Sequence, residues 1–298
     1  MRLVLLGVRG STPAPGAEFV RYGGHTSCVA VLGDGEAEPG LVLDGGTGVR
    51  GLGALTGGRP FRGTVVLTHL HWDHVQGIPF CPVLDHPDAH VDLLVPGPWD
   101  GEHGHAAAVG LKPRDLLARA MAPPHFPIAP EGLLGSWRFR PALPGRHQAG
   151  TAPVWLERLP HKGGTTLAVR VDLDDASVAY LPDHLAPADG SPPDPSLAGL
   201  LDQVDLLVHD GQFLDAEHAR AADYGHSTIG QALRLADQHQ VGRVLLTHHA
   251  PGRTDDELDR LAARVTSTPQ GRPVAFARQG DVVDVSRTLG RPLTRLVT

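Results

Sequence analysis

The chain has 298 residues and a formal net charge of −7, from 26 Lys and Arg against 33 Asp and Glu. Hydrophobic residues make up 41% and charged residues 20%, the balance of a globular protein with enough chain for a large core. The acidic balance argues against binding long nucleic acid, and no apolar stretch reaches the roughly eighteen residues of a membrane span.

The predicted strands are short apolar runs separated by Gly-rich turns. In chain order they are Leu3–Leu6, Cys28–Leu32, Leu41–Leu43, Thr64–Leu67, Val91–Val95, Val154–Leu159, Leu167–Val171, Ser177–Leu181, Val204–Val208, Arg243–Leu246, Val274–Ala277 and Val282–Val285. Helical spacing of apolar residues predicts three helices, over Leu111–Met121, Thr228–His239 and Asp255–Val265. Strands with helices between and after them favour a layered α/β fold.

We expect a single domain over residues 1–298, because the sequence has no clear linker. The stretch 96–152 is irregular and rich in Gly, Pro and His, so we interpret it as a lid or insertion over a site, although a surface loop fits it equally well. The apolar run at the N-terminus is too short for a signal peptide. With Cys28 and Cys81 in no CxxC arrangement, we expect a cytoplasmic protein with both thiols reduced and buried.

A cluster of polar residues follows the predicted strand Thr64–Leu67 directly: His69, His71, Asp73 and His74. Residues two apart on extended backbone point the same way, so the first two can reach one ion while the next two face a second. Imidazole and carboxylate are ligands that zinc and manganese accept. The chain holds 18 His, so chance clustering is the alternative, but the complete string directly after a strand indicates a metal site.

Three further residues lie just past the carboxyl ends of predicted strands, where α/β folds place reactive groups: His161, Asp183 and His248. Each also has an ordinary explanation, as a turn residue, a helix cap or a surface histidine. His249 is available beside His248, and chemistry alone does not choose between them.

These motifs resemble the metallo-β-lactamase superfamily in its phosphodiesterase branch, which includes ribonuclease Z, phosphoribosyl cyclic phosphate phosphodiesterase and class II cyclic-nucleotide phosphodiesterases. The resemblance extends nearly from end to end, through Gly-Ser-Thr-Pro at 10–13, Asp-Gly-Gly-Thr-Gly at 44–48, the string at 69–74 and Gly-His-Ser-Thr at 225–228. The string is specific for the superfamily, and the last segment points to phosphodiesterases. The resemblance implies a four-layer αββα sandwich.

The resemblance also implies roles for the site residues and two divalent metal ions, Zn2+ or Mn2+. One metal would be held by His69, His71 and His161, the other by Asp73, His74 and His248, with Asp183 bridging them. Asp73 would also orient the attacking water. His226 would contact the phosphate and assist the leaving group, and Asp210 would orient His226.

Substrate contacts are expected from Arg9, Ser11, His25 and His226, while Asp44 and Thr47 are expected to support the site. His25 departs from the family, where Asn is usual, as does Ala250, where Asp is common. These departures put the substrate in doubt more than the metal site.

The predicted function is that of a two-metal hydrolase, a phosphodiesterase that cleaves a small or cyclic phosphodiester with a hydroxide activated by the metals. The alternatives are a hydrolase of a lactone, thioester or other non-phosphate ester, and a non-hydrolytic ligand-binding or redox relative. We expect a small phosphodiester substrate, no membrane partner and, by analogy with the superfamily, a homodimer.

Overall fold

The structure is a computed structural model that describes residues 1–98, 111–187 and 190–285. Its framework is a pair of seven-stranded mixed sheets. The strands of the first sheet, in spatial order, are β14 (Val282–Asp284), β1 (Arg2–Gly7), β2 (Cys28–Leu32), β3 (Leu41–Leu43), β4 (Arg62–Val66), β5 (His90–Pro96) and β6 (Ser136–Ala142). Those of the second are β13 (Val274–Phe276), β12 (Arg243–Thr247), β11 (Leu206–Asp210), β10 (Ala176–Leu181), β9 (Thr166–Leu173), β8 (Ala152–Leu159) and β7 (Gly145–Ala149).

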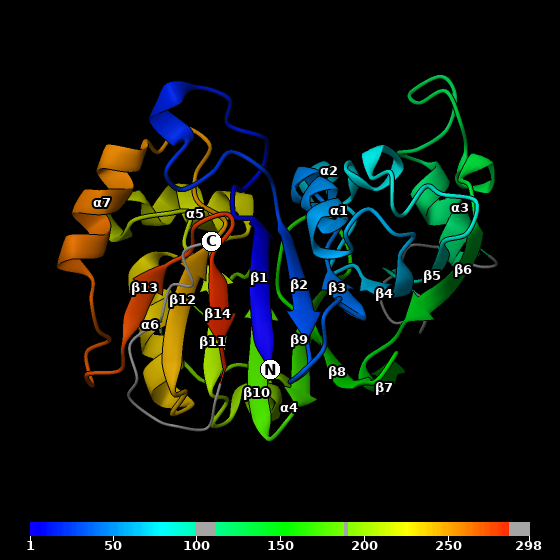
Figure 1. Cartoon of the computed structure of the whole chain (residues 1–298). Helices are drawn as coiled ribbons and strands as arrows, with labels where there is room; N and C mark the ends of the chain where they lie inside the picture. Colours follow the sequence, from blue (N-terminus) through cyan, green and yellow to red (C-terminus); the bar gives the residue numbers. More distant parts are fainter. Residues whose placement is uncertain (99–110, 188–189, 286–298) are drawn as a thin grey trace.

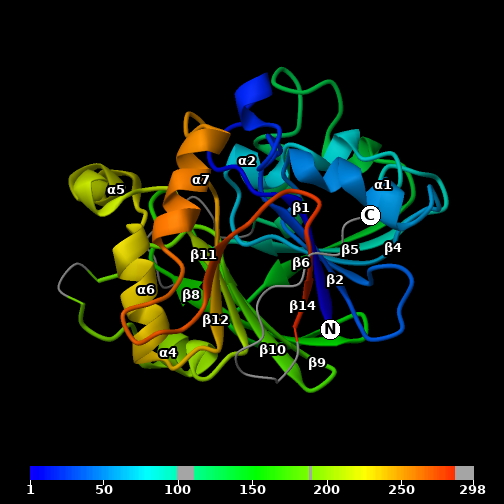
Figure 2. The ribbon, with the colours of Figure 1, turned by 60° about the vertical axis from the view of Figure 1, so that its left-hand side comes forward.

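Helices cover the outer faces of both sheets (Figures 1 and 2). They are α1 (Leu52–Leu55), α2 (Trp72–Val75), α3 (Pro113–Ala118), α4 (Pro195–Leu201), α5 (His218–Tyr224), α6 (Ile229–Gln238) and α7 (Asp255–Arg264). Short 3-10 turns span Ala17–Phe19, Thr47–Gly51, Ile78–Phe80, Pro130–Gly132 and Asp215–Glu217.

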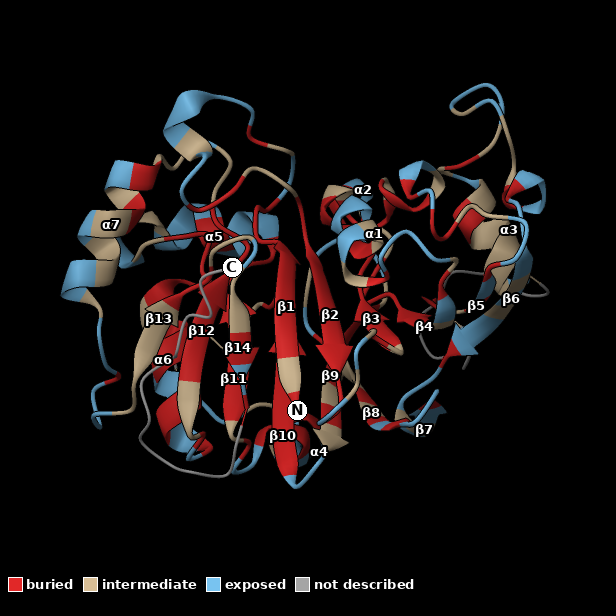
Figure 3. Ribbon diagram, in the orientation of Figure 1, coloured by how far each residue is buried: buried red, intermediate tan, exposed pale blue. Residues whose placement is uncertain are grey.

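The hydrophobic core is divided into three layers by these elements. One cluster fills the space between the sheets, where Leu5 and Leu43 of the first sheet meet Val169 and Val208 of the second. A second packs the first sheet against α1 and α3, and a third packs the second sheet against α4, α6 and α7. Burial of the central strands is visible in Figure 3. The order helix, sheet, sheet, helix confirms the predicted four-layer αββα sandwich.

Local signals explain where the two long helices begin. Thr228 and Thr254 precede α6 and α7, and each side chain accepts a hydrogen bond from the backbone N–H three residues on, while Gln231 and Glu257 return the contact. The predicted helices Thr228–His239 and Asp255–Val265 are therefore confirmed to within a residue at each end.

The stretch 96–152 is more regular than its composition indicated, although residues 99–110 lie outside the described part. It contains α3, shorter than the predicted Leu111–Met121, and the strands β6 and β7, which the sequence analysis did not predict. Both lie at sheet edges, β6 beside β5 and β7 beside β8. Strand β6 does alternate, with Trp137 and Phe139 half-buried between exposed polar residues, and this signal was overlooked. Strand β7 has no large apolar residue, so it shows no such pattern. A lid role for this stretch stays a prediction.

Helix α4 was also not predicted, although Asp194 followed by Pro195 is a start signal: the Asp194 side chain accepts from the N–H of Ser196 at 2.9 Å. Among the described residues, no helix is both long enough and apolar enough to cross a bilayer.

Candidate metal centre

The seven predicted ligands converge from four strand ends and the helix α2. His69 and His71 lie between β4 and α2, Asp73 and His74 lie within α2, and His161, Asp183 and His248 follow β8, β10 and β12. Strands β10, β11 and β12 are parallel, so their carboxyl ends meet at one edge of the second sheet. The contiguous string from the first sheet faces this edge.

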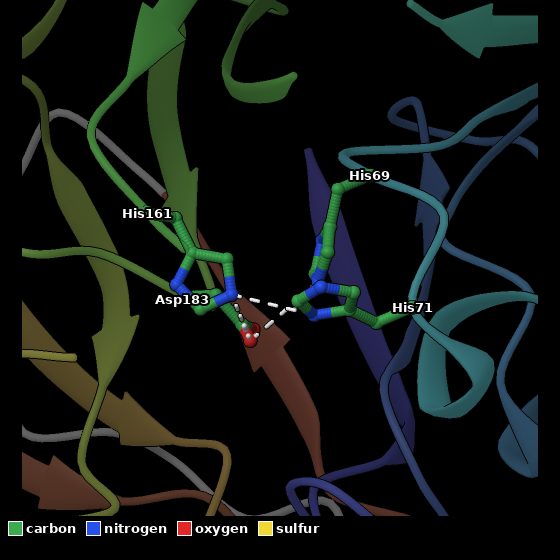
Figure 4. Close-up of side chains that lie close together, drawn as sticks. All are labelled: His69, His71, His161 and Asp183. Atoms are coloured by element: carbon green, nitrogen blue, oxygen red, sulfur yellow. Dashed lines mark hydrogen bonds and ion pairs between the residues drawn. The ribbon is translucent and has the colours of Figure 1, made fainter. Parts of the chain in front are cut away.

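Four of these residues form what we call the open group: His69, His71, His161 and Asp183 (Figure 4). Asp183 Oδ2 lies 3.6 Å from His69 Nε2 and 3.6 Å from His161 Nε2. His161 Nε2 lies 3.4 Å from His71 Nδ1. Ligand atoms of all four lie within 4.8 Å of one another, the spacing of donors around a single ion.

The closed group consists of Asp73, His74 and His248, all buried. Asp73 Oδ2 lies 3.3 Å from His74 Nε2 and 3.1 Å from His248 Nε2. The second oxygen of Asp183, Oδ1, lies 3.1 Å and 3.2 Å from the same two nitrogens. Asp183 therefore faces the open group with one oxygen and the closed group with the other, the arrangement expected of a bridging carboxylate.

His248 Nδ1 is one of four buried polar atoms in these groups that lack a hydrogen bond. The other three face neighbouring ligands: His69 Nε2, His74 Nε2 and Asp183 Oδ1. Burying such atoms without a partner is unfavourable, so a cation among them accounts for their placement. Burial also lowers the pKa of His69, His71 and His161, which keeps these imidazoles neutral, the form that coordinates metal. The donor set therefore fits divalent cations.

Asp44 supports the closed group from behind. Its Oδ2 lies 2.8 Å from His74 Nδ1, and its carboxylate accepts from the backbone N–H and hydroxyl of Thr68 and from the hydroxyl of Tyr180. Fixing one ring nitrogen of a histidine orients the other toward a metal. Thr47, also expected near the site, contacts His25 Nδ1 at 3.1 Å.

His248, and not His249, faces the cluster, which resolves the alternative that the sequence left open. The His249 ring is turned away, with Nε2 2.9 Å from the carbonyl oxygen of Ala277, and burial lowers its pKa to about 3. His248 has φ 55°, a left-handed conformation that is costly for a side chain this large. Gly10 gives it room, because a Cβ there would lie 2.4 Å from His248 Nδ1.

His226 lies beside the closed group, between α5 and α6. Its Nδ1 is 2.7 Å from Asp210 Oδ2 at the end of β11, as the resemblance implied. Burial opposes charge on this ring, but the Asp210 carboxylate outweighs it and raises the pKa of His226 to about 9. Ligand atoms of His226, Asp183 and His248 also lie within 4.8 Å of one another.

The structure gives Arg9 a different place from the predicted substrate contact. Arg9 is fully buried, and its guanidinium donates to the carbonyl oxygens of Gly23 and Arg253 at 2.7 and 2.8 Å. These bonds tie the segment after β1 to the loop before α7 and leave no exposed surface for a substrate. Ser11 is exposed, and its backbone N–H donates to Asp73 Oδ2 at 2.7 Å.

Two features of the site were missed in the sequence. Gln212 is buried beside the closed group, and its Nε2 donates to Ser11 Oγ at 3.3 Å, across 201 residues of chain. A cavity of about 1400 Å³ opens on the open group, and Trp72 is part of its wall. A lone Gln in a turn carries no signal, whereas the position of Trp72 between two predicted ligands would have been enough to single it out.

Two stacked sheets with histidine and aspartate side chains gathered at their strand ends define a metal-binding protein of the αββα class. Residues 43–249 match the family described as the beta-lactamase superfamily domain, which is more than half of the chain. The chain therefore belongs to this superfamily.

Individual relatives are more distant. The chain is 27% identical to the ribonuclease Z of Pyrobaculum arsenaticum over 90% of its own length and 94% of the relative. Some other ribonuclease Z sequences match over short stretches only, such as one from Exiguobacterium sp. with 49% identity over 16% of this chain and 16% of that sequence.

Solved structures support the fold alone. The short form of human tRNase Z aligns with a TM-score of 0.61 at 19% identity, covering 96% of this chain and 100% of that one. A diphosphatase from the PhnP family aligns with a TM-score of 0.67 at 17% identity, covering 97% and 99%.

Proposed function

We propose that this protein is a two-metal phosphodiesterase that cleaves a small or cyclic phosphodiester. The observation that carries the proposal is the His226–Asp210 pair beside the closed group. A thioester expels a thiolate, which needs little protonation, so a charged imidazole there favours a substrate that expels an alkoxide. The likeness of the Gly-His-Ser-Thr segment at 225–228 to phosphodiesterases favours a phosphodiester over a lactone. The identity of the metals, zinc or manganese, and their number belong to this proposal.

The chain supplies positioning and a proton. When bound, divalent cations supply Lewis-acid activation of water and offset negative charge on the phosphate. His226 donates its Nδ1 proton to Asp210, which leaves the proton on Nε2 available for the departing oxygen. A pKa of about 9 keeps the ring protonated near neutral pH. Asp73, held by the N–H of Ser11, orients the attacking water.

RNA is a second candidate substrate, because the Pyrobaculum arsenaticum relative is named ribonuclease Z. The net charge of −7 favours the small diester, since no general field draws a polyanion to this protein.

We propose the cytoplasm as its compartment because Cys28 and Cys81 are both free. A homodimer stays a prediction, which sedimentation velocity will test.

The first experiment is hydrolysis of bis(p-nitrophenyl) phosphate by protein loaded with zinc or with manganese, beside Asp183→Ala and His226→Ala. We expect the wild type to turn over and Asp183→Ala to be inactive. His226→Ala should lose roughly 100-fold or more in kcat, the usual contribution of a general acid, on a diester that expels an alkoxide, and much less on this ester, because p-nitrophenolate leaves without a proton. His86→Ala, a half-exposed histidine outside the cluster, is the matched control and should be unchanged.

A wild type that ignores the diester but cleaves a lactone or thioester would overturn the phosphodiesterase proposal and leave the metal site standing. Cleavage of a tRNA precursor with no activity on small diesters would favour the second candidate.

A further inference from the structure

The cavity beside the open group has two chemically different walls. His69, His71 and His161 form its floor, whereas His226 and His248 are not among the described residues that line it. One wall is apolar, with Leu70, Trp72 and Val75 around α2 and Leu116 and Leu117 from α3. The opposite wall is polar and comes from the turn between β8 and β9 and the start of α4. The cavity therefore offers an apolar face and a polar face to whatever lies next to the open group.

Trp72 is the unusual residue of this cavity. Its side chain is 74% exposed, although tryptophan is usually well buried in globular proteins. Within the described part of the chain, no hydrogen bond or ring contact holds it. It stands between His71 and Asp73, with His71 as the N-cap of α2, so the ligand geometry fixes its backbone. The indole is therefore presented at a defined place beside the open group with its face free.

The cavity has no net charge, with Arg119 and Arg158 against Glu157 and Asp194, so an anionic ligand depends on an individual cation. Its two carboxylates already have donors in the protein: Glu157 accepts from the indole N–H of Trp155 at 2.8 Å, and Asp194 caps α4. Arg119 at the end of α3 also lines the cavity and is exposed, and no acidic side chain of the described residues pairs with it. A flat ring on Trp72 with negative charge nearby matches a nucleotide.

We propose that the cavity binds the retained arm of a nucleotidyl phosphodiester, with its base stacked on Trp72. The inference rests on the proposed phosphodiesterase function and narrows its substrate class. The base belongs to the retained arm because His226, the proton donor to the leaving oxygen, lies outside the cavity. A volume of about 1400 Å³ accommodates a nucleoside, whereas a small alkyl diester would leave most of it empty.

The test compares two chromogenic esters with the same leaving group, the p-nitrophenyl ester of thymidine 5′-monophosphate and methyl p-nitrophenyl phosphate. The measured quantity is the ratio of their kcat/KM values. We expect the wild type to prefer the thymidine ester and Trp72→Leu to reduce the ratio roughly 5- to 100-fold, the loss of one stacked base. Trp72→Phe keeps an aromatic face and should retain most of the preference.

A binding measurement tests stacking of the base on Trp72 independently of catalysis. Calorimetric titration with thymidine 5′-monophosphate should show a similar fold loss of affinity in Trp72→Leu and little loss in Phe80→Leu. Phe80 is the matched control, because it is 59% exposed and does not line the cavity. Its ring instead packs edge-on against Phe126.

The outcomes distinguish the two levels of inference. If Trp72→Leu leaves both the kcat/KM ratio and the affinity for thymidine 5′-monophosphate unchanged, the base does not stack on Trp72, and the phosphodiesterase proposal still stands. If the protein binds the nucleotide through Trp72 but hydrolyses neither ester, the proposed function is wrong and the nucleotide-binding site is supported. A change of oligomeric state in Trp72→Leu, measured by sedimentation, would show that the indole serves an interface between copies and would overturn the inference.

Discussion

The open and closed groups share Asp183 yet are built in different ways. His71 and His161 of the open group line the cavity, although the side chain of His161 is only 1% exposed, whereas Asp73, His74 and His248 are all buried and do not line it. Around the closed group, Gly10 gives space, Asp44 supports His74, and the N–H of Ser11 holds Asp73. The open group has two supporting contacts: the carbonyl oxygen of Gly225 lies 2.7 Å from His161 Nδ1, and the hydroxyl of Thr68 lies 3.1 Å from His69 Nδ1.

Because of this difference, we expect the two groups to have different functions. A position that faces a cavity can exchange ligands with a substrate, and a position enclosed by packed groups holds its geometry. Mutations that act through packing should therefore damage the closed group selectively, while loss of the shared carboxylate should damage both.

The largest effect is expected from Asp183→Ala, the one change that reaches both groups. Removing it takes one oxygen from each, so metal content after dialysis should fall at both positions. The loss of affinity should exceed the roughly 10- to 100-fold typical of losing a supporting residue. Elemental analysis of the dialysed protein measures it, with Asp223→Ala, an exposed aspartate, as control. Retention of one full equivalent of metal would show that the groups do not share this ligand.

Gly10→Ala should disturb the closed group without altering a ligand. The new Cβ would lie 2.4 Å from His248 Nδ1 and 2.8 Å from Gln212 Oε1, so the imidazole must move. We expect one metal position to weaken roughly 10- to 100-fold while the other is retained. Chelator competition measures the two affinities. Gly252→Ala, where a Cβ meets nothing within 4 Å, should leave both unchanged, and an equal loss at both positions in Gly10→Ala would contradict the separation.

The metal ligands could be predicted from the sequence because their positions follow local patterns. The string at 69–74 is contiguous, and the later ligands each follow a strand, so periodicity and position located six of the seven residues that the structure brings together. For the seventh they left His248 and His249 open, and the choice of His248 came from the resemblance. Their role as ligands stays a prediction that metal titration will test. The same strand pattern predicted the layered fold, and β2 and β3 begin and end at the predicted residues.

Supporting contacts were out of reach because they join distant segments. Tyr180 reaches Asp44 across 136 residues, and Gln212 reaches Ser11 across 201, so neither pair has a local pattern. Arg9 was misplaced for the same reason: an arginine near a predicted site is usually assigned to an anion, and its burial against carbonyl groups depends on the fold of the C-terminal half. The edge strand β7 has no large apolar residue to show alternation, whereas β6 alternates from Ser136 to Arg140 and its pattern was overlooked.

Asp44→Asn tests the support of the closed group with a smaller structural change than Gly10→Ala. Asn tolerates the left-handed backbone found at Asp44, where φ is 61°, so the turn should survive. The change removes the negative charge that faces His74 Nδ1 at 2.8 Å. We expect metal affinity at the closed position to fall about tenfold, at the low end of supporting-residue effects. Chelator competition measures the affinity and thermal unfolding checks the fold; an undiminished affinity would mean that the carboxylate charge contributes nothing.

The smallest expected effect is a shift in pH dependence from Asp210→Asn. The Asp210 carboxylate, 2.7 Å from His226 Nδ1, raises the pKa of that ring to about 9 against the opposing effect of burial. For a diester that expels an alkoxide, the protonated donor is present below its pKa and lost above it, so a lower pKa moves the alkaline limb of kcat to lower pH. We expect a displacement of at least about one pH unit, as for removal of one adjacent charge.

Two variants serve as controls. Asp223→Asn should leave the alkaline limb in place, and in His226→Gln the limb should vanish altogether. Metal content should stay at the wild-type level in Asp210→Asn, because this carboxylate belongs to neither group; an unmoved limb with full metal content would mean that another group donates the proton.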